Sequence, residues 1–291
     1  MSGEWIIGII GGSGLYQMDA LDDAQWIPVK SPWGEPSDAV LCGSIGGTKV
    51  RFLPRHGRGH RIAPHQVNAR ANVDALKRAG CTDILAISAV GSLTDDLPPG
   101  RAAIVDQFID HTSRQETSFF GTGLVAHVSM ADPVCKRLSQ MAAVAVNKAG
   151  GEASMGGTYI AIDGPQFSSR AESKLYKGWG ADVIGMTAMP EAKLAREAEL
   201  PYALIGLVTD YDAWKDEADP VSVDEVVAQL QRNSQVARRT IECFVNGLSE
   251  FREESPIDFA LEDAVITAAE KHDPVLLAKL DAVAGRLLGS V

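Results

Sequence analysis

Short aliphatic runs, separated by stretches with helical spacing, constrain the fold of this chain more than any other feature. The runs lie at residues 6–10, 84–87, 102–105, 159–162, 183–186 and 203–208. Apolar spacing and terminal residues predict helices over 66–79, 133–149 and 190–199. Such runs are typical of strands that are buried on both faces. The alternation therefore predicts a single α/β domain with a mixed, largely parallel central β-sheet flanked by helices.

The last part of the chain is predicted to be helical and partly separate. Ser222-Val223-Asp224-Glu225 matches a capping box and predicts a helix that ends near Asn246. A polar stretch that contains one proline follows, and residues 260–288 predict two helices broken at Asp273-Pro274. We expect a main domain over 1–250 and a helical tail over 251–291. This tail would pack on the domain or lie at a subunit interface.

The charge balance limits the classes of partner. Lys and Arg number 27 against 38 Asp and Glu, a net charge of −11, which disfavours nucleic acids and anionic membranes. The 4 cysteines form no C-x-x-C pair, so we expect free thiols and no zinc or redox motif. A signal peptide and a bilayer-spanning apolar run are not expected either. We therefore expect a cytoplasmic protein, and a small anionic ligand stays possible because a few local donors can hold one phosphate.

A glycine cluster, Gly11-Gly12-Ser13-Gly14, follows the first predicted strand. A dinucleotide fingerprint would need glycine where Gln17 stands, and a Walker loop would need a lysine that is absent. Similar turns occur at 88–92 and 185–188, and they carry hydroxyls at Ser88 and Thr187. Because ligands bind at the carboxyl ends of strands in open α/β sheets, these turns predict one anion site. Plain strand–helix turns are the alternative.

The stretch Pro54-Arg55-His56-Gly57-Arg58-Gly59-His60 concentrates cations and imidazoles in an acidic chain. An arginine fork suits phosphate, and the interleaved glycines favour a loop that approaches a ligand closely. A surface basic patch is the alternative. No carboxylate lies within this stretch and the histidine spacing fits no standard ligand set, so a metal site is not expected.

Two further stretches carry candidate residues. Phe167 lies in a turn that enters a helix, where it could pack in the core or stack on a ring. Asp210 and Asp212 lie at the tip of the last predicted strand, where carboxyl groups can act as acid or base. Capping of the following segment is the alternative.

Taken in order, these stretches resemble the trimeric purine nucleoside phosphorylase family, and within it the branch that acts on 5′-methylthioadenosine. The resemblance covers residues 6 to about 245 and is carried by GIIGGSGL, SPWGEPSD, PRHGRGH, SAVGSL, DQFIDHT, DGPQFSSRAES, WGADVIGMTAMPE and TDYDAWK. It implies the nucleoside phosphorylase fold and a homotrimer. It also implies phosphorolysis, in which inorganic phosphate attacks C1′ and yields adenine and 5-methylthioribose 1-phosphate. Phosphate would be a co-substrate, and no metal or organic cofactor is expected.

The resemblance also implies which residues form each sub-site. The phosphate set contains Ser13, Arg55, His56, Ser88, Ala89 and Thr187. The nucleoside set contains Phe167, Ser168, Met186, Asp210, Asp212, Val223 and Val226, with His127 from a neighbouring subunit. Asp210, Asp212 and His56 would take part in catalysis. An aspartate at 210 can accept from N6–H and donate to N7 of an adenine-type base, whereas the 6-oxopurine enzymes carry an amide there.

Some positions depart from the family pattern. Gly185 stands where asparagine is more common in the methylthioadenosine branch, Ala188 replaces a threonine or similar residue, and Gln166 stands where arginine is common. A methylthioinosine or 6-oxopurine nucleoside phosphorylase is therefore an alternative. A nucleoside sensor without catalysis on the same fold is a second one.

Overall fold

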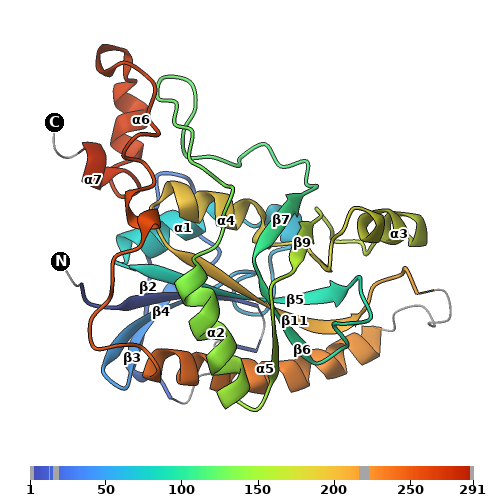
Figure 1. The fold of residues 1–291 in the computed structure, drawn as a ribbon. Coiled ribbons are helices and arrows are strands. Elements are labelled where there is room, and N and C mark those ends of the chain that lie inside the picture. Colours follow the sequence, from blue (N-terminus) through green and yellow to red (C-terminus); the bar gives the residue numbers. More distant parts are fainter. Residues whose placement is uncertain (1–2, 13, 16–19, 216–222, 289–291) are drawn as a thin grey trace.

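The computed structural model describes residues 3–12, 14–15, 20–215 and 223–288; for 223–228, 230 and 288 it describes the backbone only. An 11-stranded mixed sheet forms the centre of this described part (Figure 1). Its strands are β1 Ile6–Gly11, β2 Asp22–Ile27, β3 Val40–Ile45, β4 Thr48–Pro54, β5 Asp83–Ser92, β6 Arg101–Val105, β7 Gln107–Asp110, β8 Glu152–Met155, β9 Thr158–Ala161, β10 Val183–Gly185 and β11 Tyr202–Tyr211. The prediction of a mixed, largely parallel sheet is confirmed.

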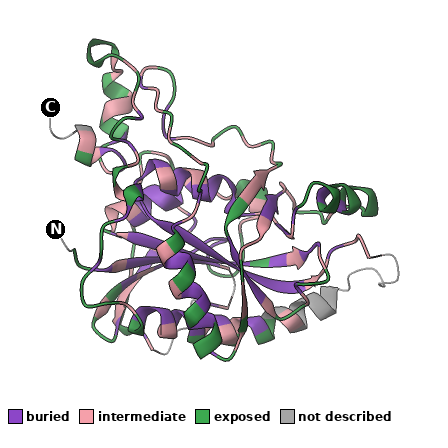
Figure 2. Cartoon of the chain, in the orientation of Figure 1, coloured by how far each residue is buried: buried purple, intermediate pink, exposed green. Residues whose placement is uncertain are grey.

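Helices cover both faces of this sheet. The α-helices are α1 Ala69–Arg78, α2 Lys136–Lys148, α3 Arg170–Gly178, α4 Ala188–Glu197, α5 Val223–Asn246, α6 Pro274–Lys279 and α7 Gly285–Leu288. Short 3-10 turns lie at Pro64–Gln66, Pro256–Phe259 and Ala269–Lys271. Helices α1 and α4 pack together over one core cluster, while α2 and α5 pack over the other. The strands are buried between these layers, and α3 is largely exposed (Figure 2).

Strand β5 changes its neighbour along its length, and this change opens the sheet. Its first half pairs in parallel with β1 as far as Ala86, and its last residues pair with β10 from Gly91 onwards. Strand β11 pairs with the other edge of β5 from Ile84 to Ser92. Among the described pairings, residues 87–90 therefore have no strand on one edge. The gap lies where the glycine-rich turns end, so it can receive a ligand.

The expected helices are present with small changes at their ends. The one expected over 66–79 begins at Ala69, because the Asn68 side chain accepts the Ala71 N–H at 3.0 Å and caps it. The ones expected over 133–149 and 190–199 are α2 and α4, and α5 ends at Asn246 as predicted. Ser222 of the expected capping box lies outside the described residues.

Five strands lie outside the aliphatic runs from which strands are predicted: β2, β3, β4, β7 and β8. The antiparallel β3–β4 hairpin turns at Gly46-Gly47, where both glycines have positive φ, 56° and 85°. A Gly-Gly pair between strands is a known hairpin signal, so this element was predictable. Strand β2 is mostly exposed and polar, which left no apolar pattern to detect.

The prediction of two helices in the tail is wrong for its first half. Residues 260–272 form turns and a short 3-10 segment, and their backbone groups bond to the loop at 123–127 instead. His127 N–H donates to Ala264 at 2.8 Å, and Ile266 N–H donates to Val125 at 3.0 Å. At Asp273-Pro274 a helix begins rather than breaks, since Asp273 caps α6 by accepting the Val275 N–H at 2.7 Å.

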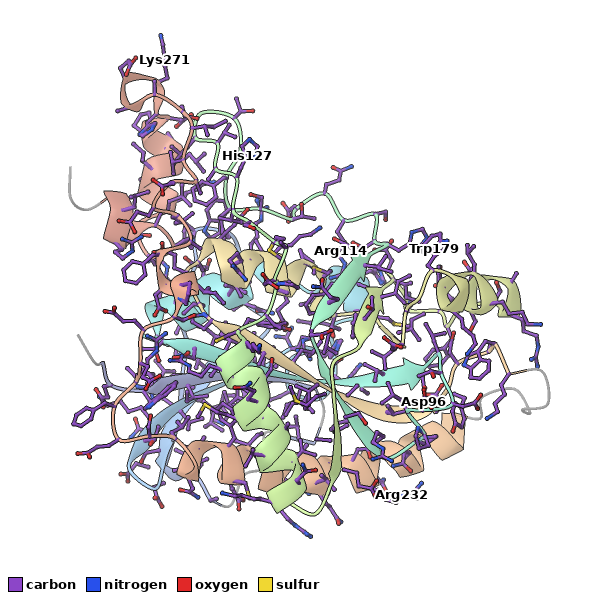
Figure 3. All side chains as sticks on the ribbon, viewed as in Figure 1. Asp96, Arg114, His127, Trp179, Arg232 and Lys271 are labelled. Carbon is purple, nitrogen blue, oxygen red and sulfur yellow. The ribbon has the colours of Figure 1, made fainter. Side chains whose placement is uncertain are left out.

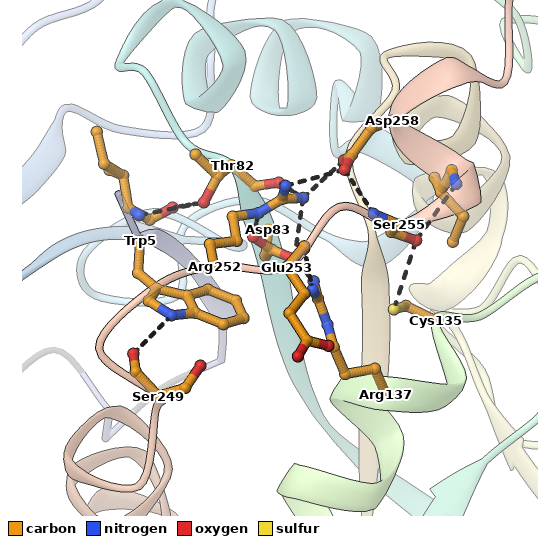
Figure 4. A network of polar contacts seen from close by, with 12 residues as sticks. Trp5, Thr82, Asp83, Cys135, Arg137, Ser249, Arg252, Glu253, Ser255 and Asp258 are labelled. Carbon is orange, nitrogen blue, oxygen red and sulfur yellow. Dashed lines mark hydrogen bonds and ion pairs between the residues drawn. The ribbon is translucent and has the colours of Figure 1, made fainter. Parts of the chain in front are cut away.

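A buried ionic cluster fastens the tail to the amino end of β5 (Figure 4). Asp83 is fully buried and accepts hydrogen bonds from both Arg252 and Arg137, the latter at 2.8 Å. Arg252 also donates to Asp258, whose Oδ2 lies 2.9 Å from Nη1.

Within the described ranges, each helix is too short or too polar to cross a membrane.

We expect Arg252→Ala to lower the free energy of unfolding by about 3–5 kcal/mol, because it removes one partner of a buried charge. Urea denaturation measures this. Lys49→Ala is the matched control, since Lys49 and Glu4 form an exposed pair and its loss should cost less than about 1 kcal/mol. Equal effects of the two substitutions would contradict a structural role for the Asp83 cluster.

Candidate active site

A cavity of about 580 Å³ opens at the carboxyl ends of β1, β5, β10 and β11, where β5 lacks a neighbour. Its wall is formed by residues from all of the predicted turns. The described predicted residues in this wall are Arg55, His56, Ser88, Ala89, Phe167, Ser168, Met186, Thr187, Asp210 and Asp212. Distant parts of the sequence are therefore brought to one site.

Arg55 lies at the floor of this cavity, and its charge is already neutralised. Its guanidinium donates to both carboxylate oxygens of Glu191, Nε–Oε2 at 2.9 Å and Nη2–Oε1 at 3.0 Å. It also donates from Nη1 to the Ile87 carbonyl at 2.9 Å. Both partners of the pair are almost completely buried, at 1% and 2% exposure. Arg55 therefore brings a rigid donor to the cavity but little free positive charge.

His56 is held as a neutral imidazole. Its Nδ1 lies 2.9 Å from the Ile62 carbonyl, which can only accept, so Nδ1 carries the proton and Nε2 is an acceptor. Burial lowers the pKa of His56 to about 4, although the bond to Ile62 opposes this shift. The His60 ring stacks on it with centroids 4.3 Å apart. His56 can therefore accept a hydrogen bond from a protonated phosphate oxygen.

Hydroxyl and backbone groups complete this end of the cavity. The Ser88 and Thr187 hydroxyl oxygens lie 3.1 Å apart. Thr187 directly precedes α4, whose backbone departs from helical geometry at Met189 (φ −115°, ψ 134°). Gly12 and Gly14 line the cavity on the β1 side, whereas Ser13 lies outside the described residues. The described members of the predicted phosphate set thus share one end of the cavity.

Asp210 and Asp212 lie beside Gly91 and Ser92 at the carboxyl end of β5, three residues and more beyond Ser88. A bulge between Val208 and Asp210 shifts the register of β11, and bulges re-aim side chains in this way. Thr209 donates to Oδ1 of Asp210 at 2.5 Å. The Asp212 carboxyl group is buried next to the Ser173 hydroxyl and the Ala213 N–H, both of which oppose the effect of burial on its pKa. Asp212 therefore also caps the segment that follows it, while both carboxylates line the cavity wall.

Burial raises the pKa of both carboxyl groups, and the charge of Asp212 adds to the shift at Asp210. A raised pKa keeps a proton available at a pH where an exposed carboxyl group has lost it. The cavity therefore offers donors for an anion and also a carboxyl group that can bond or protonate a ligand.

Met186, Phe167 and Ser168 also line the cavity. Phe167 is 62% exposed, so it belongs to the cavity mouth and not to the core. The side chains of Val223 and Val226 lie outside the described residues. His127 is exposed beside the tail, does not line the cavity, and could reach a site only in another subunit (Figure 3).

Comparison with known proteins decides the family. The model of the Phosphorylase superfamily matches residues 6–246. The chain belongs to this superfamily. It is 52% identical to the S-methyl-5′-thioadenosine phosphorylase of Cereibacter sphaeroides over 97% of this chain and 98% of that protein. It is 50% identical to the enzyme of the same name from Bradyrhizobium diazoefficiens, with the same shares covered.

Solved structures agree with this assignment. A methylthioadenosine phosphorylase from an Antarctic soil metagenomic library superposes with a TM-score of 0.91 at 44% identity, covering 97% of this chain and 99% of that one. The methylthioadenosine phosphorylase from Schistosoma mansoni in complex with adenine gives a TM-score of 0.79 at 38% identity, covering 84% and 91%. The resemblance stated from the motifs is confirmed, and so is the nucleoside phosphorylase fold.

Several residues of this phosphorylase site were missed from the sequence. Arg114 donates to the carbonyls of Met186 at 2.8 Å, Pro64 at 3.0 Å and Met189 at 3.1 Å, and so ties two cavity walls together (Figure 3). One feature of the sequence could have identified Glu191: it is an acidic residue in the first turn of the helix that follows Thr187. No such feature indicates Arg114, because its contacts join segments 50 to 75 residues apart.

We expect Asp212→Asn to stabilise the folded phosphorylase at pH 8. The folded state raises the pKa of Asp212, so it binds that proton more tightly than the unfolded chain does. Wild-type stability therefore falls as pH rises through the raised pKa, and the neutral amide avoids this loss. Thermal unfolding should give a higher Tm for the variant at pH 8 and a smaller difference at pH 5. Asp96→Asn, at an exposed carboxylate, is the control, and the same pH trend there would contradict the argument.

Proposed function

We propose that this phosphorylase cleaves 5′-methylthioadenosine with inorganic phosphate. A phosphate oxygen forms a bond to C1′ as the bond from C1′ to N9 breaks, and its electron pair leaves with adenine. The products are adenine and 5-methylthioribose 1-phosphate. The observation that carries the proposal is that one cavity wall holds both hydrogen-bond donors for an anion and two carboxyl groups of raised pKa.

At the phosphate end, neutral and neutralised groups orient the nucleophile. Arg55, the Ser88 and Thr187 hydroxyls and the backbone at Ala89 donate, while Nε2 of His56 accepts from a protonated oxygen. Such fixed dipoles stabilise charge without reorganising during the reaction. Glu191 keeps the guanidinium in one orientation, so the attacking oxygen can be held near C1′.

At the purine end, Asp210 carries the leaving-group chemistry. A protonated Asp210 donates to N7 as the bond to N9 breaks, and as a carboxylate it accepts from N6–H. Burial favours the protonated form, which is the form that N7 requires. The relatives that cover nearly all of this chain are named for methylthioadenosine, which supports an adenine-type base.

The assembly, compartment and cofactor requirement are part of the same proposal. We infer a cytoplasmic homotrimer that serves purine and methionine salvage, in which His127 contributes to the 5′ pocket of a neighbouring subunit. Inorganic phosphate is the co-substrate, and no metal or organic cofactor takes part. The free thiols of the 4 cysteines fit a reducing compartment.

The deciding experiment measures adenine release from methylthioadenosine by purified protein with and without phosphate. We expect release only with phosphate, and no change after treatment with a chelator. The same assay with methylthioinosine, inosine and adenosine ranks bases and 5′ groups. Preference for methylthioinosine or inosine would favour the 6-oxopurine alternative. Nucleoside binding that ignores phosphate, with no turnover, would favour a sensor.

Asp210→Asn should shift preference away from 6-aminopurines. The amide cannot protonate N7, and the expected change in discrimination is about 1–3 kcal/mol in kcat/KM between methylthioadenosine and methylthioinosine. Asp96→Asn, at a residue that does not line the cavity, should leave the ratio unchanged. An equal loss on both substrates would show that Asp210 does not select the base.

His127→Ala should raise KM for methylthio substrates without dissociating the assembly. His127 is exposed in a single chain, so its removal leaves the fold of that chain intact. Steady-state kinetics and sedimentation measure the two effects, and KM for phosphate serves as the internal control. An unchanged KM for methylthioadenosine would remove His127 from the site.

A further inference from the structure

Glycine is required at position 185 by contact with a neighbouring side chain and not by the backbone conformation at 185. Gly185 is not among the residues with positive φ, so its conformation suits any amino acid. A Cβ atom at this position would instead lie 2.1 Å from the hydroxyl oxygen of Tyr159, 2.6 Å from Cζ and 3.0 Å from Cε2. The Tyr159 ring therefore occupies the space that a side chain at 185 would need.

Tyr159 is fully buried and reaches across from the neighbouring strand. In the parallel pair of β9 and β10 it lies opposite Val183, two residues before Gly185. Its hydroxyl oxygen accepts the backbone N–H of Thr187 at 3.3 Å. Burial raises the pKa of Tyr159, so this hydroxyl stays neutral. The ring thus runs beneath 185 and ends under the phosphate donors.

The hydrogen bond between the Thr187 N–H and the Tyr159 hydroxyl affects the orientation of Thr187. Thr187 caps α4, yet its side chain makes no capping hydrogen bond to the helix. Its hydroxyl lies 3.1 Å from that of Ser88 instead, at the cavity wall. Tyr159 accepts the Thr187 N–H and also interacts with the Thr187 side chain, so it holds both the backbone at 187 and the hydroxyl that lines the cavity.

We propose that Tyr159 and Gly185 act as one unit that positions the phosphate donors, with Tyr159 as the positioning residue and Gly185 leaving room for it. The identity of the anion rests on the proposed function. One consequence concerns specificity: the wall at 185 presents no side chain to the nucleoside, so selection of the base falls on other lining residues, Asp210 and Asp212 among them.

Four proteins test this unit: wild type, Gly185→Ala, Tyr159→Leu and the double variant. Calorimetric titration with inorganic phosphate alone measures binding, so the result does not depend on nucleoside turnover. Gly185→Ala should weaken phosphate binding by about tenfold or more, because Tyr159 and the turn at 187 must move apart. Tyr159→Leu should weaken it less, since only the acceptor for one N–H is lost.

The double variant is decisive. Leucine removes the atoms that the new Cβ would meet, so adding Gly185→Ala to Tyr159→Leu should change phosphate affinity no further. Tyr159→Phe with Gly185→Ala should recover only in part, because Cζ remains 2.6 Å from the Cβ position. Additive losses, or unchanged phosphate binding in Gly185→Ala, would overturn the proposal.

Gly178→Ala is the matched control, because no atom lies within 4 Å of its Cβ position and its φ is not positive. It should bind phosphate as wild type does. If Gly185→Ala does not fold, a folded double variant that binds phosphate supports the unit, and a double variant that also fails to fold contradicts it. Phosphate binding that follows this pattern without any nucleoside cleavage would leave the unit intact and reject the proposed function instead.

Discussion

The ion pair between Arg55 and Glu191 is the interaction on which the site depends. Two opposite charges at 1% and 2% exposure are tolerable only when their hydrogen-bonding groups find partners. The partners found here come from separate elements: the Ile10 carbonyl of β1, the Ile87 carbonyl of β5, and the Tyr202 hydroxyl of β11, which donates to Glu191 at 2.8 Å. The pair therefore fixes the ends of these strands relative to α4, and the cavity is the space that this arrangement leaves open.

This pair also explains how a chain of net charge −11 can hold an anion. A free guanidinium would attract any anion, whereas one paired with Glu191 mainly orients the anion through a hydrogen bond. In the proposed phosphate site, selection then depends on dipoles: two hydroxyls and an imidazole that accepts. His56 in this neutral form distinguishes an anion that carries a proton from one that does not. A nucleophile held by such groups keeps more of its own charge for attack on C1′.

The sequence predicted the turns of the site better than the contacts that hold them. Ser88, Thr187 and Asp210 could be placed because each follows an aliphatic run, and parallel strands bring their carboxyl ends to one edge. The Arg55–Glu191 pair could not be predicted, because the two residues lie 136 positions apart in the sequence. The residues around each of them do not indicate its partner. The first half of the tail was assigned to helix because its composition allows one, but its backbone groups pair with residues 123–127. Such pairing is tertiary and leaves no local pattern.

The two ends of β5 show how stability and function are separated along one strand. At its amino end Asp83 is buried and satisfied by Arg137 and Arg252, so its charge binds the tail and α2 to the sheet. At its carboxyl end Oδ2 of Asp210 and Cβ of Asp212 lie 3.5 and 3.4 Å from the position that a Cβ atom would take at Gly91, and burial raises the pKa of both carboxyl groups. An unsatisfied buried carboxyl group destabilises a fold, and only an environment fixed by other interactions can retain it. The Asp83 cluster and the Arg55–Glu191 pair supply that fixed environment for Asp210 and Asp212.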